Sequence, residues 1–213
     1  MSQEAFQTAL ARLVTETDFR ERVRADGEAA LDRDLTRLEQ ERLVKLAGDH
    51  GLEVTASLIA SYRLGKVLGL LPLTRVLLGN ERLGRELRHF WADHPPTSFY
   101  AADECVAFCD HLRRALRLGR LRQVYLAEVV AYERAVLELT RPRVTGDQPP
   151  PQRVRFRHDP VRLLTPLGAG RRPRGVPERH CVFTGSLADD GTMKWSVTEK
   201  RGGGLNPRVA SYT

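Results

Sequence analysis

Three consecutive prolines, Pro149–Pro151, are the feature that most constrains the fold of this chain. Proline has no backbone N–H and a fixed φ, so it ends helices and is excluded from the middle of a sheet. Before these prolines, apolar residues recur at helical spacing. Directly after them, in "RVRFRH" (153–158), apolar residues alternate with arginines, which is typical of a half-buried strand. The sequence therefore predicts helices before the prolines and a sheet after them.

The part before the prolines reads as about six or seven helices joined by short breaks. Thr36 and Glu39 have the spacing of a capping box, Gly48 is a helix stop, and Pro72 ends or kinks the next helix. That next helix is apolar around most of its circumference, so we expect it at the centre of the core. In the last helix, Glu128 and Glu133 are expected on the solvent-exposed side. The helical patterns cover 17–31, 36–48, 52–71, 81–94, 101–116 and 122–139.

The part after the prolines reads as a small second domain. Asp159 and Pro160 are a cap and a first helical residue, and two more strands, at 180–185 and 192–199, are joined by a turn containing Asp190-Gly191. We therefore predict an α+β fold: a helical bundle at 1–140, a proline-rich linker at 141–152, a small α/β domain with about three strands at 153–199, and a flexible tail at 200–213.

A single layer of three strands is too small to stand alone, so it needs a neighbour. That neighbour is the helical domain, another protein, or a peptide that adds a strand to an open edge. The alternation in the first strand places Val154 and Phe156 on a core face and leaves the arginines between them facing outward.

Positive charge is concentrated in the last third of the chain. Residues 141–213 hold 14 Lys and Arg against 6 Asp and Glu, a net charge of +8, while the rest holds 20 against 21, a net charge of −1. Such a segment favours a negatively charged partner, which could be nucleic acid, a membrane surface or an acidic peptide. A solvated basic face is the alternative.

The chain is expected to be soluble and cytoplasmic. Its first residues, "MSQEAFQTALARLV", lack a basic segment followed by an apolar run, and no window approaches the roughly 20 apolar residues of a membrane span. Cys105, Cys109 and Cys181 are an odd number without the spacing of a disulfide framework, so no bridge is predicted.

No residue pattern predicts a metal centre or an active site. Cys105 and Cys109 share a helix face, but Phe108 and Leu112 lie on the same face, which favours a core role for both thiols. His158 beside Asp159 has the form of a base and its orienting carboxylate, although Asp159 is better used as a helix cap. We therefore predict a non-enzymatic chain without a cofactor. The potential metal ligands weighed were His89, His94, Cys105, Cys109 and His111.

A helix-turn-helix DNA-binding regulator is the main alternative. Residues 35–63 contain two amphipathic helices around a glycine-containing turn. The second helix, however, has only Arg63 and Lys66 as cations, which offers little for phosphates.

Several stretches together resemble a known family. They are "LIASYRLGKVLGLLPLTRVLLGNERLGRELRHFWADHPPTSFYAADECVAFCDHL", "VYLAEVVAYERAVLEL" and "VRFRHDPVRLLTPL". In order and spacing they are similar to the partner proteins of multinuclear non-heme iron oxidative enzymes that act in ribosomal peptide pathways, such as those of methanobactin and thiaglutamate. The resemblance covers about two thirds of the chain, from Leu58 to Val197, and includes no catalytic motif. Members of this family have also been labelled DNA-binding.

The resemblance implies an adaptor that holds the leader of a precursor peptide on the sheet of the small domain and presents the peptide's cysteine to the enzyme. The iron is then expected in the partner enzyme, and this chain holds none. The turn in "HPPTSFY" is the expected enzyme interface, with residues His94, Pro95, Pro96, Phe99 and Tyr100. The expected peptide-binding residues are Val154, Arg155, Phe156, Arg157, Val182, Phe183, Trp195 and Val197, with Phe183 and Trp195 as anchors unless both are core residues.

Overall fold

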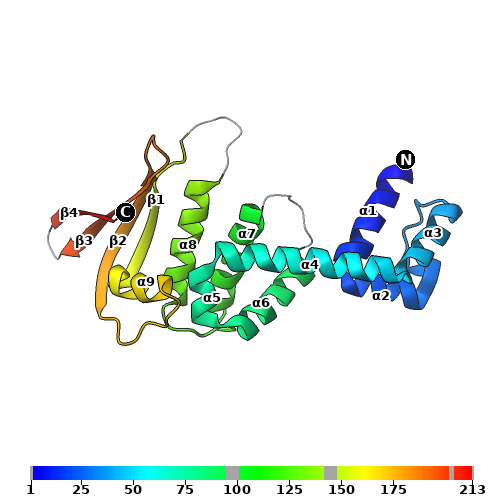
Figure 1. The fold of residues 1–213 in the computed structure, drawn as a ribbon, viewed down its shortest axis with the longest axis horizontal. Helices are drawn as coiled ribbons and strands as arrows, with labels where there is room; N and C mark the ends of the chain where they lie inside the picture. Colours follow the sequence, from blue (N-terminus) through cyan, green and yellow to red (C-terminus); the bar gives the residue numbers. More distant parts are fainter. Residues whose placement is uncertain (1, 95–100, 142–147, 202–203, 213) are drawn as a thin grey trace. The chain divides into compact units, whose positions relative to one another are not determined.

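The computed structural model has the predicted α+β fold, with helices followed by an antiparallel sheet (Figure 1). It describes residues 2–94, 101–141, 148–201 and 204–212, and beyond residue 198 it describes only the backbone. The chain divides into two compact units. Unit 1 comprises residues 1–66 and 91–99, and unit 2 comprises residues 67–90 and 100–213.

Unit 1 is a small helical cluster. It contains α1 (Ser2–Thr15), α2 (Thr17–Asp26), the short 3₁₀ helix η1 (Gly27–Ala30), α3 (Arg37–Ala47) and most of α4 (His50–Leu70). The predicted capping box is present, since Thr36 and Glu39 each accept the other's backbone N–H at the start of α3. The core is formed by α1, α2 and α3 around Leu13, Phe19, Val23 and Leu43.

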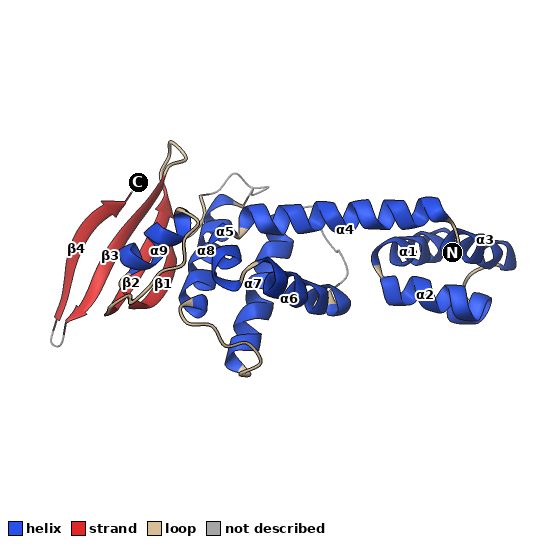
Figure 2. Ribbon diagram, turned by 60° about the horizontal axis from the view of Figure 1, so that its bottom comes forward, coloured by secondary structure: helices blue, strands red, loops and turns tan. Residues whose placement is uncertain are grey.

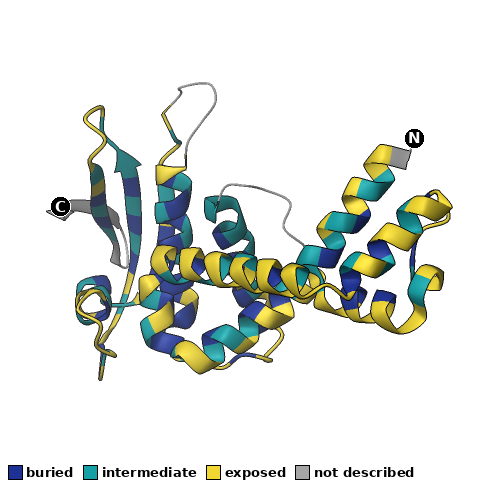
Figure 3. Ribbon diagram, turned by 45° about the vertical axis from the view of Figure 1, so that its right-hand side comes forward, coloured by how far each residue is buried: buried dark blue, intermediate teal, exposed yellow. Residues whose placement is uncertain are grey.

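The expectation that α4 lies at the centre of the core is wrong. Of its 21 residues, only Ala56 and Val67 are buried. Most of the helix is coloured as exposed in Figure 3. Apolar composition on all sides indicated burial, but in the structure the apolar side chains of α4 lie largely at the surface.

The helices of unit 2 pack around aromatic residues. They are α5 (Pro72–Leu78), most of α6 (Asn80–Asp93), α7 (Ala101–Arg117) and α8 (Leu126–Thr140). Phe90 of α6 and Phe108 of α7 are fully buried, with ring centroids 5.4 Å apart.

The start of α5 is capped from a distance by α8. The Glu133 carboxylate accepts the backbone N–H of Leu73 at 2.6 Å and that of Thr74 at 2.9 Å, together with the Thr74 hydroxyl. A carboxylate at a helix N-terminus satisfies N–H groups that have no partner within the helix. Glu133 is therefore buried, 4% exposed, which corrects its predicted place on the solvent-exposed side.

The sheet of unit 2 has four strands in the order β1-β2-β3-β4, with all neighbours antiparallel (Figure 2). The helix α9 (Pro160–Gly168) follows the first strand. The structure has one strand more than the predicted three, because β4 lies in the segment where we expected a flexible tail. The strands are β1 (Gln152–His158), β2 (Glu178–Leu187), β3 (Met193–Arg201) and β4 (Gly204–Tyr212).

The division into units differs from the predicted domains. The proline-rich segment joins α8 to β1 within unit 2, and most of its centre, 142–147, lies outside the described residues. The sheet packs against α8: the Tyr132 and Trp195 rings lie 4.9 Å apart. The helical neighbour that a small sheet needs is thus α8.

Within the described part of the chain, no single helix combines the length and the apolar composition of a membrane span; the bent pair α4 and α5 meets that test only when taken together.

Candidate peptide-binding face of the sheet

The two faces of the sheet differ in chemistry because residues alternate along each strand. In β1, Val154 and Phe156 are buried while Arg153, Arg155 and Arg157 are exposed, as the sequence predicted. The burial pattern in Figure 3 shows the same alternation along the strands.

The inner face is a packed core that reaches α8. The Phe183 ring lies 5.5 Å from Phe156 and 5.6 Å from Trp195, all as ring-centroid distances. Five of the predicted peptide-binding residues belong to this face and are between 2% and 6% exposed: Val154, Phe156, Phe183, Trp195 and Val197. Phe183 and Trp195 are therefore core residues, which was the alternative to their predicted role as peptide anchors. Their side chains are buried and do not face a ligand.

The outer face is polar and basic. Here Arg155 lies opposite Val182, and Arg153 lies opposite Thr184. Lys194 adds a fourth cation on β3, opposite Ser186 of β2. The described outward positions of the three strands carry mostly cationic or small polar side chains, with one carboxylate, Glu178 at the start of β2: Arg153, Arg155, Arg157, Glu178, His180, Val182, Thr184, Ser186, Lys194, Ser196 and Thr198. Lys194 was not among the residues predicted from the sequence, although its alternation with Trp195 indicates the same outward face.

The sheet has two edge strands, β1 and β4, and among the described residues β1 pairs only with β2. The Arg157 N–H points away from β2 and donates to the Glu128 carboxylate of α8. Backbone groups alternate in direction along an antiparallel strand, so the N–H and C=O groups of Arg153 and Arg155 point toward the same edge. Another strand can pair along this edge up to Arg157, whose backbone N–H is already bound by the Glu128 carboxylate.

Glu128, not Asp159, is the partner of His158. Its carboxylate accepts the His158 backbone N–H at 2.9 Å and lies 2.8 Å from the ring Nδ1, while the Tyr125 ring packs edge-on at a centroid distance of 4.8 Å. Asp159 caps α9 through the N–H groups of Val161 and Arg162, as predicted.

Glu128 is 8% exposed, which corrects its predicted place on the solvent-exposed side. No local sequence signal marks it, because its partners lie 29 and 30 residues away along the chain.

The three cysteines are buried core residues. Burial raises the pKa of Cys105 to about 12 and raises that of Cys109 well above its ordinary value, so both remain protonated thiols near neutral pH. His89 and His94 are exposed, whereas His111 lies beside Glu86, with 3.4 Å between Nε2 and the carboxylate. Within the described ranges, no three His, Cys, Asp or Glu side chains come together in a way that could hold a metal ion.

The predicted enzyme interface falls largely outside the described residues. Only His94 is described, and it is exposed. Pro95, Pro96, Phe99 and Tyr100 lie within 95–100, which the structure does not describe.

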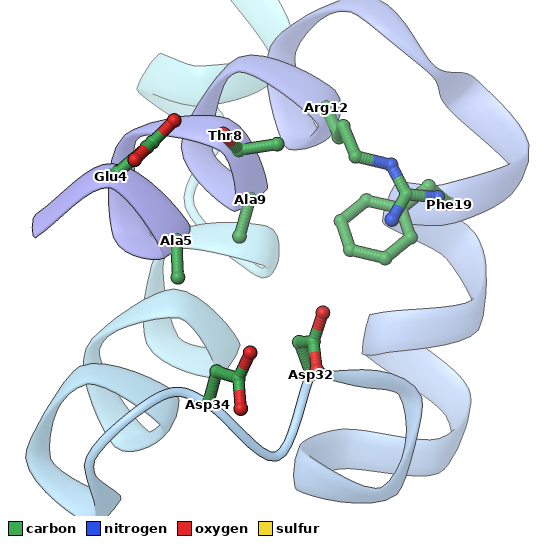
Figure 4. A pocket seen from close by; sticks show the side chains of 8 residues that line it. All are labelled: Glu4, Ala5, Thr8, Ala9, Arg12, Phe19, Asp32 and Asp34. Atoms are coloured by element: carbon green, nitrogen blue, oxygen red, sulfur yellow. The ribbon is translucent and has the colours of Figure 1, made fainter. Parts of the chain in front are cut away.

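Unit 1 has a separate pocket of about 480 Å³ (Figure 4). Arg12 lies over the Phe19 ring, 3.9 Å from its centroid, and is held by three hydrogen bonds to Glu16. Asp32 and Asp34 extend toward the opening from below. This lining is acidic, opposite in sign to the outer face of the sheet, and it is built by Glu4, Ala5, Thr8, Ala9, Arg12, Phe19, Asp32 and Asp34.

Comparison of the chain with protein-family models, with curated proteins and with solved structures found no match in any of the three.

Proposed function

We propose that this chain is a non-catalytic partner subunit that binds the leader of a ribosomally made precursor peptide and presents the peptide's cysteine to an iron-dependent oxidase. The observation that carries the peptide-binding part is the basic outer face of the sheet beside the free edge of β1. The role of the enzyme and its iron rests on the sequence resemblance alone.

The β1 edge supports a specific mode of binding. A peptide that pairs with Arg153 and Arg155 gains backbone hydrogen bonds, which depend little on its sequence. Acidic side chains of the peptide on the outward face then lie beside the arginines of β1, and charge-assisted contacts select them. Because Glu128 occupies the edge at Arg157, the added strand is expected to be short.

The first test is affinity purification of the tagged chain from its native host after nuclease treatment, followed by mass spectrometry and metal analysis. The proposal expects an iron-containing protein and a short cysteine-bearing peptide at near-stoichiometric levels. Recovery of the chain alone, or only with protected nucleic acid, contradicts it.

Substitutions in β1 test the binding site once the peptide has been recovered. Replacing Arg153 and Arg155 together by serine is expected to weaken peptide binding at least about tenfold, because two charge-assisted contacts are lost. The matched control replaces Arg120 and Arg122, two exposed arginines in the loop before α8, with the same change of charge. Equal binding by both double variants would place the peptide elsewhere.

The backbone contribution is tested separately at Arg155. Arg155→Pro removes an N–H that points away from β2, whereas Arg155→Ala keeps that N–H and loses only the side chain. Pairing at this edge predicts weaker binding by the proline variant than by the alanine variant. Similar affinities of the two variants would exclude strand addition at β1.

The DNA-binding alternative has less support. Although α3 and α4 follow one another with a short turn and α4 is exposed, the only cations on α4 are Arg63 and Lys66, and Arg63 lies 4.7 Å from the ring centroid of Trp91. Protected duplex DNA in the purification described above would favour this alternative.

A further inference from the structure

One face of α4 carries two parallel rows of residues, one bulky and one small. Val54, Leu58 and Tyr62 repeat every four residues and are 45%, 65% and 66% exposed. Side chains spaced by four residues form a ridge that is slightly inclined to the helix axis. The small row runs beside this ridge at the same spacing and is also exposed: Ser57, Ser61 and Gly65.

Among the described residues, Lys66 Nζ lies over the Tyr62 ring, 5.1 Å from its centroid, and both rows stay exposed. A Cβ built on Gly65 would meet no atom within 4 Å, so no close neighbour requires a glycine there. Glycine in a helix interior is unfavourable relative to alanine, and helices in proteins are stabilised mainly by packing of an apolar face. Both rows lack charged residues, which disfavours an acidic peptide or a nucleic acid as the occupant.

We propose that α4 packs against α4 of a second copy of this chain, in a parallel, right-handed crossing near Ser61. In this crossing class, ridges spaced by four residues interdigitate at an angle of about −40 to −50°. In this crossing the ridges of the two helices run parallel to one another, and the two-fold axis is parallel to them. The axis therefore places the bulky row of each copy against the small row of the other. One helix thus supplies both halves of a self-complementary contact, which is what a symmetric dimer needs.

The orientation and the strength of the dimer follow from the same rows. An antiparallel pair with this crossing would bring each bulky row against the other bulky row, so the parallel arrangement is favoured. The rows from Val54 to Gly65 extend over about three helical turns. Two such faces bury less than the roughly 1,200 Å² of a standard interface, so we expect a weak dimer with a Kd in the micromolar range.

Sedimentation velocity of the full chain over a concentration series tests dimerisation. The wild type is expected to shift from monomer to dimer as concentration rises. Leu58→Ser removes one bulky residue from each copy, and Gly65→Gln fills the small row; each is expected to raise the dimer Kd at least about tenfold. Gly65→Gln also replaces a helix-interior glycine, so its helicity is expected to stay equal or rise.

Two matched controls are available in unit 2. Leu118→Ser changes a residue that is 62% exposed, close to the 65% of Leu58. Gly84→Gln changes another helical glycine, whose Cβ would come no closer than 3.8 Å to a neighbour. Neither control is expected to alter the Kd. A wild type that stays monomeric up to about 0.5 mM, or a dimer that all four variants leave unchanged, overturns the proposal.

Disulfide trapping tests the orientation. In a parallel crossing at Ser61, Ser61→Cys brings two new thiols within reach of a disulfide, and copper phenanthroline is expected to give a covalent dimer. Ala60→Cys, about 100° around α4 from Ser61 and also exposed, is the control and is expected to remain monomeric. The three native cysteines are buried and do not compete. Equal trapping at both positions, or capture of a different protein by this face with no dimer, contradicts the proposal.

Discussion

At the scale of single residues, two buried carboxylates accept hydrogen bonds from backbone N–H groups that have no partner within their own helix or sheet. Glu133 caps α5, and Glu128 receives two N–H groups at the edge of β1. Burial of a charge is costly unless donors surround it, and both carboxylates have such donors. Each therefore fixes one element of unit 2 against α8.

Stability is expected to depend on pH through Glu133. Burial, partly offset by its hydrogen bonds to Thr74 and Leu73, raises the pKa of Glu133 from 4.5 to about 7. Between these values the folded state binds more protons than the unfolded state, so the free energy of unfolding falls as pH rises from 4.5 to 7, by up to about 3 kcal/mol.

The measurement is urea unfolding of the wild type and of Glu133→Gln at several pH values. The variant is expected to lack this part of the slope. Glu138→Gln, on the same helix, with its side chain 21% exposed, is the control. Parallel pH profiles for the wild type and Glu133→Gln would show that Glu133 does not titrate in this range.

Gly185 is required by the ring of Trp195 on the neighbouring strand. A Cβ at Gly185 would lie 2.7 Å from two ring atoms, so alanine forces the ring or the strand to shift. Gly185→Ala is expected to lower the free energy of unfolding by about 1–3 kcal/mol. Thermal or chemical unfolding measures this change. Gly168→Ala, where a Cβ meets nothing within 4 Å, is expected to be neutral or stabilising, and equal losses in both variants would count against the steric reason.

At the scale of elements, the sheet is held to α8 at two points, one on β3 and one on β1. The aromatic core of the inner face packs on the helix, and Glu128 anchors the C-terminal end of the strand. This arrangement leaves the N-terminal part of the edge, around Arg153 and Arg155, open for another strand. The contacts with α8 thus both stabilise the sheet and determine which part of the β1 edge is open to a peptide.

Removal of the Glu128 side chain is expected to loosen this anchor. Glu128→Ala leaves the N–H groups of Arg157 and His158 without their partner, at a cost of about 2–4 kcal/mol in the free energy of unfolding. Glu138→Ala breaks only a pair with Arg134 at 3.7 Å and is expected to cost less than about 1 kcal/mol.

Chemical unfolding and amide exchange check this expectation. In the Glu128→Ala variant, amide hydrogen exchange is expected to become faster mainly at the C-terminal end of β1. Similar losses in the Glu128→Ala and Glu138→Ala variants would show that the hydrogen bonds to β1 do not control stability.

At the scale of the whole molecule, charge is divided between the two ends of the sequence. The last third has a net charge of +8 and the remainder a net charge of −1. The fold gathers four of these cations, Arg153, Arg155, Arg157 and Lys194, on the outer face of the sheet. An acidic peptide and a nucleic acid would both be attracted to this face, but they differ in how binding depends on salt.

Binding to a random DNA duplex is expected to be weak and strongly dependent on salt. If the four cations of the outer face each neutralise one phosphate, the slope of log K against log salt is about −4. Replacement of Arg153 and Arg155 by serine is expected to make that slope less steep by about 2. Fluorescence anisotropy with a labelled duplex measures both slopes. Tight, sequence-selective binding that survives high salt would contradict a peptide-binding role and favour the regulator.

Short-range sequence patterns were enough to predict the local features of this protein. The prolines, the alternation in β1, the capping box at Thr36 and the cap at Asp159 each act on neighbours within a few residues, so propensity and spacing were enough to place them. The α+β class and the outward arginines followed from the same short-range rules.

Long-range contacts set which elements share a unit, which face of α4 is exposed, and which acidic residues are buried. The partners of Glu128 and Glu133 lie roughly 30 and 60 positions away, and the pairing partner of a strand edge is likewise set by the whole chain. Such contacts depend on which surfaces meet when the core forms, and no local pattern encodes that.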